Sequence, residues 1–173
     1  MTNTKDKWVS EFLENSIYRL DESTRMIKIS LDSVSDSDIW KKPNESSNSI
    51  GNQIAHICGN MTQYIIASLG EQDDYRNRDE EFSMTGGFSK IELIQKLEDT
   101  VKKARLVLNS CDKGELIKKR LVQGTNLSGI GVVIHAVEHY SYHTGQIAFW
   151  TKLIANRDLG FYAGRDLNTK NEL

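Results

Sequence analysis

The chain has 173 residues, a length typical of one domain around one hydrophobic core. It carries 22 basic and 24 acidic side chains, which gives a net charge of −2. Nucleic-acid-binding proteins need an excess of basic side chains, so this charge argues against nucleic acid as a main partner. The sequence has no apolar run long enough for a membrane span, and its charged N-terminus does not fit a secretory signal. We therefore expect a single cytoplasmic domain over residues 1–173, with no membrane or nucleic-acid partner.

A single proline, Pro43, favours an all-α chain. Apolar residues spaced three or four apart predict a first helix from Val9 to Val34, ending before Asp36. After the polar segment that follows Pro43, the same spacing predicts a second helix over residues 48–69, with a serine or asparagine cap at its start.

A long acidic connection over residues 70–88 follows the second helix. Its segment 73–81 is interpreted either as a solvated charge run or as a cover for a site, with Arg76 and Arg78 contacting an anionic substrate. Ser89 and Glu92 form a predicted capping box for a third helix over residues 90–110. About 18 extended residues span roughly 60 Å, twice the length of a 20-residue helix, so the second and third helices are expected to run parallel.

Residues 112–127 show no clear period and are expected to be irregular or short strands. The fourth helix, residues 128–156, is apolar almost all round, which indicates either a central helix or a subunit interface and makes a homodimer our expectation. The segment after Arg157 is expected to lie on the surface. Four helices of these lengths predict a four-helix bundle.

Three of the four histidines, His135, His139 and His143, lie one turn apart on the fourth helix. The fourth, His56, lies on the second helix, on a face that carries polar residues. Helical histidines four residues apart are a common pair of metal ligands, so a divalent metal is the main hypothesis. Buried structural histidines, or histidines that stabilise a dimer interface, are the alternative.

Two known metal patterns were compared with these residues. His135, Glu138 and His139 match the HxxEH string of inverted zinc peptidases, but nothing else in the chain indicates a peptidase. Di-iron bundles need ExxH on two helices, and the sequence contains no ExxH, which excludes that class.

The segments SIGNQIAHICGNM around His56 and EHYSYHTGQI around His139 and His143 resemble the DinB-like superfamily, which includes YfiT-like thiol transferases and hydrolase-like proteins. The resemblance covers nearly the whole chain in length and helix order. It implies an up-down-down-up four-helix bundle with a long crossover between helices two and three. It also implies a divalent metal, zinc or nickel, held by His56, His139 and His143.

Such a site, with three neutral imidazoles and an open position, lowers the pKa of a bound water or thiol. We therefore expect a transferase or hydrolase acting on a small molecule, possibly a low-molecular-weight thiol. The competing hypothesis is a non-catalytic bundle with a structural metal. Gly145 is expected to allow close helix approach. The following further residues are candidates for lining the pocket or supporting the ligands: His135, Gln146, Asn52, Asn60, Gln53, Glu138 and Tyr142, with Trp40, Tyr64 and Tyr140 as possible aromatic walls.

Overall fold

The computed structural model describes residues 7–172, which are mostly helical. Its long helical segments are α1 (Lys7–Asp32), α3 (Ile50–Met61) with its π-helical continuation η1 (Thr62–Leu69), α5 (Lys90–Ser110) and α7 (Gly129–Ala155). The shorter elements are α2 (Asp36–Ile39), α4 (Arg78–Ser83), α6 (Lys113–Ile117), β1 (Lys119–Val122) and β2 (Thr125–Ser128). The predicted helical class is confirmed, and all four predicted helices are present.

Serine caps fix where three of the long helices begin. The hydroxyl oxygens of Ser49, Ser89 and Ser128 each accept a hydrogen bond from the backbone N–H three residues later, which satisfies one donor of the exposed first turn. The capping box at Ser89 is therefore confirmed. At the other end of α7, Asn156 adopts the left-handed conformation, with φ of 49°, that commonly terminates a helix.

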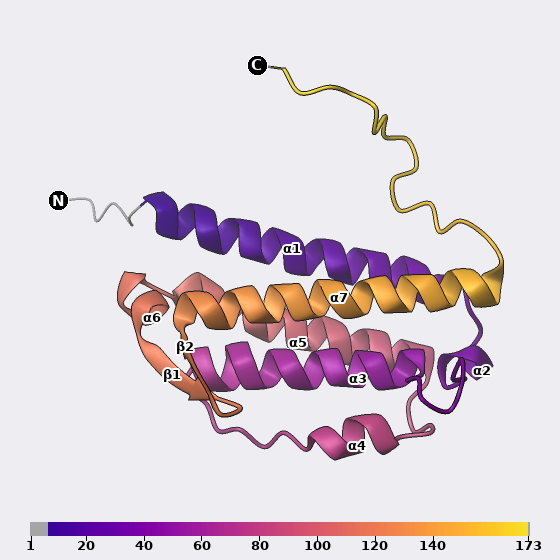
Figure 1. Cartoon of the computed structure of the whole chain (residues 1–173), viewed down its shortest axis with the longest axis horizontal. Helices are drawn as coiled ribbons and strands as arrows, with labels where there is room; N and C mark the ends of the chain where they lie inside the picture. The colour runs from indigo at the N-terminus through magenta and orange to yellow at the C-terminus, as the bar shows by residue number, and fades with distance from the viewer. Residues whose placement is uncertain (1–6, 173) are drawn as a thin grey trace.

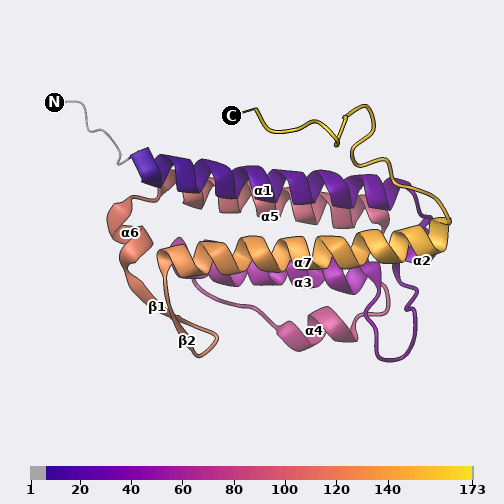
Figure 2. The same cartoon turned by 45° about the horizontal axis from the view of Figure 1, so that its top comes forward.

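The four long segments lie side by side (Figures 1 and 2). Helix α1 packs against α5 and α7, and α3 packs against the same two helices. Helices α1 and α7 both begin at the end of the molecule near the chain's N-terminus, whereas α3 and α5 both begin at the opposite end (Figure 1). Between the end of η1 and the start of α5, the chain runs back beside α3 and forms α4 on the way (Figure 1).

The core is built from the apolar stripes that the sequence predicts. Leu20, Ile27 and Leu31 of α1 are fully buried, as are Ile54 and Ile65 of the second helical segment. Tyr140 of α7 is buried too, and its hydroxyl lies 2.8 Å from Thr24 Oγ1 of α1. Since the Thr24 hydroxyl already donates to the carbonyl of Leu20, Tyr140 is the donor in this interhelical bond.

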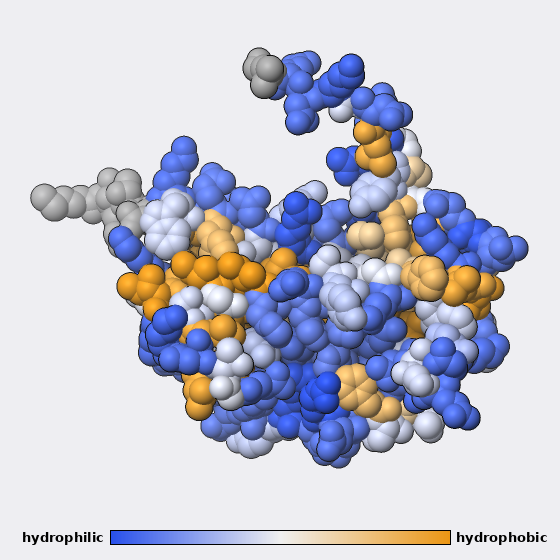
Figure 3. Space-filling view, viewed as in Figure 1, coloured by the Kyte–Doolittle hydropathy of each residue, from blue (hydrophilic) through white to orange (hydrophobic). Residues whose placement is uncertain are grey.

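Helix α7 is not covered on every side, as a central helix would be. Figure 3 shows apolar residues near both ends of α7, with less apolar ones over its middle. Its exposed face carries the large apolar side chains Ile134, Tyr142, Phe149 and Leu153. The other expectation for this helix, a subunit interface, stays a prediction.

Several connections differ from the sequence-based expectations. The turn α2 and the crossover helix α4 were not predicted. Residues 113–128 form α6 and an antiparallel hairpin, in which Lys119 pairs with Ser128, so the chain is not purely α-helical. The hairpin turns at Gln123 and Gly124, both with positive φ, a conformation that matches the twist of the strands.

No helix within residues 7–172 combines the length and apolar character needed to cross a membrane. After α7 the chain runs over the surface as expected, although Leu159 is buried.

We predict that Tyr140→Phe lowers the free energy of unfolding by about 1 kcal/mol, because it removes the donor of the α1–α7 hydrogen bond without changing the packed ring. Urea denaturation measures this change. Tyr142→Phe is the matched control. Tyr142 is 62% exposed, so loss of its hydroxyl should leave the midpoint of urea denaturation unchanged. Equal midpoints for both variants and the parent protein would contradict the prediction.

Candidate metal centre

Three histidines from two helices converge between α3 and α7. One ring nitrogen from each of His56, His139 and His143 lies within 4.8 Å of the other two. His56 and His143 are buried, whereas His139 is partly exposed. The ring of His56 lies 4.8 Å from that of His139 and 5.0 Å from that of His143, measured between centroids.

This arrangement fits a tetrahedral divalent cation. Zinc–nitrogen bonds of about 2.0–2.1 Å at tetrahedral angles place the nitrogens about 3.3 Å apart. Nε2 of His56 lies 3.0 Å from Nε2 of His139, so the two nitrogens already face each other at nearly that separation. The His143 nitrogen lies within 4.8 Å of both, so the three nitrogens are close enough together that they could hold one cation.

The Nδ1 atoms of two of these rings are held by outer partners. His56 Nδ1 lies 2.8 Å from Glu81 Oε2, and His143 Nδ1 lies 2.9 Å from Gln146 Oε1. Because a carboxylate and an amide oxygen only accept, both rings carry hydrogen on Nδ1 and leave Nε2 free as a ligand. Such partners orient the metal-binding histidines of many proteins.

Glu81 is the functional residue that the sequence interpretation missed. It lies in α4, is only 8% exposed and also accepts two hydrogen bonds of 2.8 Å from Arg76. Burial raises the pKa of this carboxyl, but the hydrogen bonds from Arg76 and His56 outweigh burial, so its pKa lies below the usual value. Glu81 is therefore an ionised acceptor for His56.

The solvated interpretation of the 73–81 segment is wrong for Arg76 and Glu81. The Arg76 side chain is 3% exposed, and its guanidinium also donates to Gln63 Oε1, whose amide in turn donates to Asp74. Arg76 is thus held against Glu81, Gln63 and His56, and its contact with an anionic substrate stays a prediction. Arg78 lies over the ring of Phe82, which packs against His56. Buried charges of this kind cannot be predicted from the local sequence, because the partner carboxylate and the buried surroundings are brought together only when the chain folds.

The polar face around His56 holds the crossover in place. Asn52 Nδ2 donates to the carbonyls of Glu81 and Met84, at 3.0 and 2.8 Å, so Asn52 does not line the pocket as expected. Asn60 Nδ2 instead lies 3.3 Å from His135 Nε2. Asn52 therefore anchors the crossover to α3, and Asn60 contacts α7.

His135 lies outside the group of three rings. It stacks on Tyr64 with a centroid distance of 4.0 Å, and burial lowers its pKa. Of the two alternative pairs on α7, the structure therefore brings His139 and His143, rather than His135 and His139, together with His56.

The remaining candidates surround this centre in different ways. Gln53 is buried and, within the described chain, its Oε1 has no hydrogen-bond partner. Tyr142 is exposed, with its ring edge-on to His143 at 5.0 Å. Glu138 is exposed and, with His139 and Tyr142, lines an open hollow of about 540 Å³. The hollow gives solvent access to the His139 side of the centre.

Two aromatic candidates lie away from the centre. The Tyr140 hydroxyl bonds to α1, and the Trp40 indole donates to the carbonyl of Phe88. Cys58, which is buried, has its pKa raised to about 11 by burial, so it remains a thiol and is a poor metal ligand.

The rings of His139 and His143 are neutral at physiological pH. Burial and the neighbouring His143 and His56 lower the pKa of His139 to about 3. Burial and His56 lower the pKa of His143 to about 4. Each of these two rings therefore carries a single hydrogen near pH 7, which leaves one of its nitrogens free for a cation.

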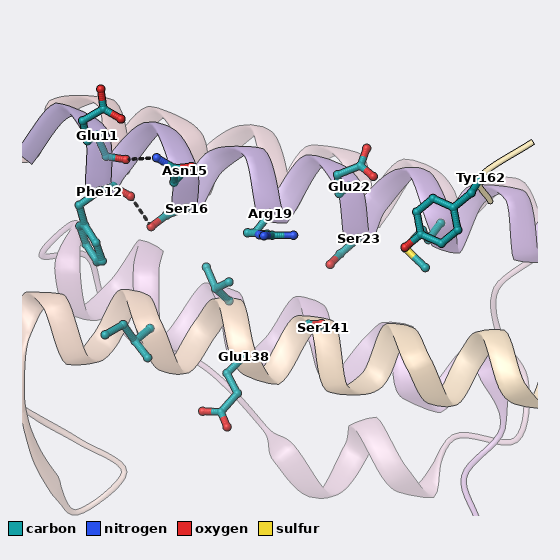
Figure 4. Close-up of a pocket in the computed structure, with 13 residues that line it drawn as sticks. Glu11, Phe12, Asn15, Ser16, Arg19, Glu22, Ser23, Glu138, Ser141 and Tyr162 are labelled. Carbon is teal, nitrogen blue, oxygen red and sulfur yellow. Dashed lines mark hydrogen bonds between the residues drawn. The ribbon is translucent and has the colours of Figure 1, made fainter. Parts of the chain in front are cut away.

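A larger hollow, of about 760 Å³, lies elsewhere. It is a groove between α1 and α7 whose walls include Phe12, Met26 and Val137 (Figure 4). None of the three converging histidines lines it. The volume of a hollow is therefore not a guide to where the three histidines converge.

Comparisons with known proteins agree with this architecture. The family described as "Protein of unknown function (DUF1572)" matches residues 7–162. A search of curated proteins gave no match.

Three solved structures share the fold. A conserved protein from Enterococcus faecalis superposes with a TM-score of 0.72 at 15% identity, covering 83% of this chain and 97% of its own. A DinB-like protein from Bacillus subtilis gives 0.64 at 16% identity, with 90% and 99% covered. A DinB-like protein from Bacillus cereus gives 0.62 at 16% identity, with 83% and 90% covered. At these identities the similarity shows the fold alone.

We predict that Glu81→Gln weakens zinc binding by about 10- to 100-fold, because the amide no longer offers an ionised acceptor to His56 Nδ1. Competition with a chromogenic chelator measures the affinity. Glu80→Gln, a change at the exposed neighbouring residue, is the matched control and should bind zinc like the parent protein. Equal affinities for all three proteins would show that Glu81 does not position His56.

Gly59 provides a test that leaves every polar group in place. A Cβ atom at this position would overlap Glu81 Oε1 and lie 3.0 Å from Arg76 Nε. We predict that Gly59→Ala weakens zinc binding about tenfold by displacing Glu81 from His56. The same change favours the helix by up to about 1 kcal/mol, so affinity should fall without a comparable loss of stability.

Gly145→Ala is the control for this substitution. Nothing lies within 4 Å of a Cβ atom at Gly145, so the expectation of close helix approach there is wrong. This variant should keep the zinc affinity of the parent protein. If Gly59→Ala binds zinc as tightly as Gly145→Ala, the close approach of Glu81 to α3 is not needed for the site.

Proposed function

The chain belongs to the DUF1572 family, and on this premise we propose that it is a DinB-like, divalent-metal-dependent enzyme acting on a small molecule. The observation that carries the proposal is the convergence of His56, His139 and His143 to within 4.8 Å. The proposal includes a single domain folded as an up-down-down-up four-helix bundle. This topology is supported by the helix directions, since α1 and α7 begin at one end of the molecule and α3 and α5 begin at the other (Figure 1).

The donor set supports zinc or nickel. Both metals accept imidazole nitrogen, and three histidine ligands leave at least one coordination position for a further ligand. A divalent cation held here supplies a Lewis acid that lowers the pKa of a coordinated water or thiol towards neutrality. The chain's own contribution is to bring three imidazole rings together and to hold two of them, His56 and His143, in place through Glu81 and Gln146.

Thiol transfer and hydrolysis are the two reaction classes that this site serves. In a transferase, a low-molecular-weight thiol provides the nucleophile. In a hydrolase, water attacks an ester or amide. The hollow in front of His139 gives either substrate a route to the site.

The open hollow also favours an enzyme over the alternative of a purely structural metal. Structural zinc sites are closed by four protein ligands, whereas here three histidines converge and one of them is partly exposed. A dimer stabilised by histidine contacts receives less support, because two of the three histidines are buried within one chain. A homodimer through the exposed apolar face of α7 is compatible with the proposal.

Metal analysis of protein purified without a histidine tag tests the proposal. We expect about one divalent metal per chain, retained in His135→Ala and lost in His56→Ala and His143→Ala, because only the last two remove a converging ligand. Circular dichroism shows whether each variant is folded. Absence of stoichiometric metal from the parent protein, or equal loss in His135→Ala, would overturn the site.

Activity separates the two reaction classes. The metal-loaded protein is assayed with a low-molecular-weight thiol and an electrophile, and separately with ester and amide substrates. A reaction that needs both the metal and the thiol identifies a transferase. Turnover of esters or amides without thiol identifies a hydrolase, and a fully loaded protein that does neither and binds no thiol or azide favours the structural metal.

A further inference from the structure

The open hollow beside the metal centre carries negative charge only. The residues that line it are His135, Glu138, His139, Ser141 and Tyr142. Burial lowers the pKa of both histidines, so their rings are neutral near pH 7. Glu138 is therefore the one charged side chain among the described residues that line this hollow. A ligand that approaches His139 from solvent meets a carboxylate.

The Glu138 carboxylate is available to a ligand. Glu138 is exposed, and Figure 4 shows its side chain pointing away from α1. Burial lowers the pKa of His135, and the negative charge of Glu138 partly offsets this effect, which indicates that the charge lies near another wall of the hollow. Within residues 7–172, no lysine or arginine forms an ion pair with Glu138.

The two arginines of the crossover do not supply a cation to this hollow. Neither of them is among the residues that line it. The charge of Arg76 is paired with Glu81, and the guanidinium of Arg78 lies 4.7 Å from the ring centroid of Phe82. An anionic group that enters the hollow is therefore repelled by Glu138 without meeting a cation on the walls.

Tyr142 adds an aromatic surface beside the carboxylate. It follows Glu138 by four residues on α7, so the two side chains are neighbours on one face of the helix, and both line the hollow. Tyr142 is 62% exposed, which leaves much of its ring open to a ligand. The face of an aromatic ring attracts cations, as a carboxylate does. A carboxylate and an aromatic ring one turn apart suit an organic ammonium ion.

We propose that the substrate of this site carries a positively charged ammonium group, which binds at Glu138 and Tyr142 while its reacting group lies at the metal centre. The inference rests on the proposed function, because the metal receives the reacting end of the molecule. The hollow, of about 540 Å³, has the size of a small-molecule site. This substrate class is opposite in charge to the anionic substrate predicted for Arg76 and Arg78, so one set of ligands tests both.

Three thiols of different charge test the proposal. Thiocholine carries a trimethylammonium group, 3,3-dimethylbutane-1-thiol is its neutral counterpart of the same shape, and 3-mercaptopropionate is an anion. Calorimetric titration into the zinc-loaded protein measures the three dissociation constants. The thiol groups themselves differ in acidity, so the informative quantity is the change of each constant when one side chain of the hollow is substituted.

Glu138→Gln removes the charge and keeps the shape of the side chain. We expect it to weaken thiocholine binding about fivefold, to strengthen 3-mercaptopropionate binding by a similar factor and to leave the neutral thiol unchanged. Added salt should diminish both changes, because it screens an exposed charge. Glu14→Gln removes the same charge from an exposed position of α1 and is the matched control, with no change expected for any of the three thiols.

A second pair of variants tests the aromatic ring. Tyr142→Leu should weaken thiocholine binding about threefold relative to the neutral thiol, whereas Tyr142→Phe, which keeps the ring, should bind both like the parent protein. Circular dichroism and zinc content, measured on the same samples, show that each variant is folded and loaded.

The possible failures are distinguishable. If Glu138→Gln, loaded with zinc, changes the binding of thiocholine no more than that of the neutral thiol, the ammonium subsite is overturned alone. A Glu138→Gln variant that binds 3-mercaptopropionate more weakly than the parent protein overturns it too. A parent protein that holds no stoichiometric zinc overturns the proposed function, and the subsite with it. A zinc-loaded protein that binds none of the three thiols overturns the open metal position on which both rest.

Discussion

The contact between the Glu81 carboxylate and the His56 ring is the interaction on which the site depends. His56 is the single histidine contributed by α3, so without it the two ligands of α7 have no partner across the helix interface. Glu81 comes from a different segment, the crossover, and reaches His56 because Gly59 leaves room for its carboxylate. The orientation of one metal ligand thus depends on the folding of a connection.

The crossover is held by contacts that resemble those of a core element rather than a loop. Asn52 binds two of its carbonyls, and Arg76 pairs with Glu81 in an environment almost closed to water. A buried ion pair adds little to stability, because the cost of desolvating both charges offsets their attraction. The pair is better explained by orientation, since Arg76 keeps Glu81 ionised and directed at His56.

The sequence was sufficient to predict the four long helices, because each has an apolar stripe and three have a serine cap. The one-turn spacing of His135, His139 and His143 is also visible without a structure, and the resemblance to the DinB-like superfamily then selected His139 and His143 together with His56. It could not predict Glu81 or Arg76 as buried partners, since a carboxylate in an acidic run has no local signal that distinguishes it from its exposed neighbours. The hairpin was expected only as possible short strands, because its pairing depends on a turn at Gln123 and Gly124 with positive φ rather than on a hydrophobic period.

The hydrogen-bond pattern also shows which ring nitrogens of His56 and His139 carry a hydrogen. The His56 Nδ1 lies 2.8 Å from Glu81 and 3.1 Å from Arg76 Nη2. The shorter contact, with an ionised acceptor, assigns the hydrogen to Nδ1, because a carboxylate cannot donate. A neutral His56 therefore has a bare Nε2, and His139 Nε2 at 3.0 Å must be the donor to it.

In this form His139 carries its hydrogen on the nitrogen that faces the other ligands. Binding of a cation at that nitrogen requires the hydrogen to move to Nδ1. His139 is the partly exposed member of the three, so its ring is the one that can exchange this hydrogen with solvent through the open hollow. His56 and His143 are already in the tautomer that binds metal, fixed by Glu81 and Gln146, and the adjustment on metal binding falls on the single ring that the fold leaves accessible.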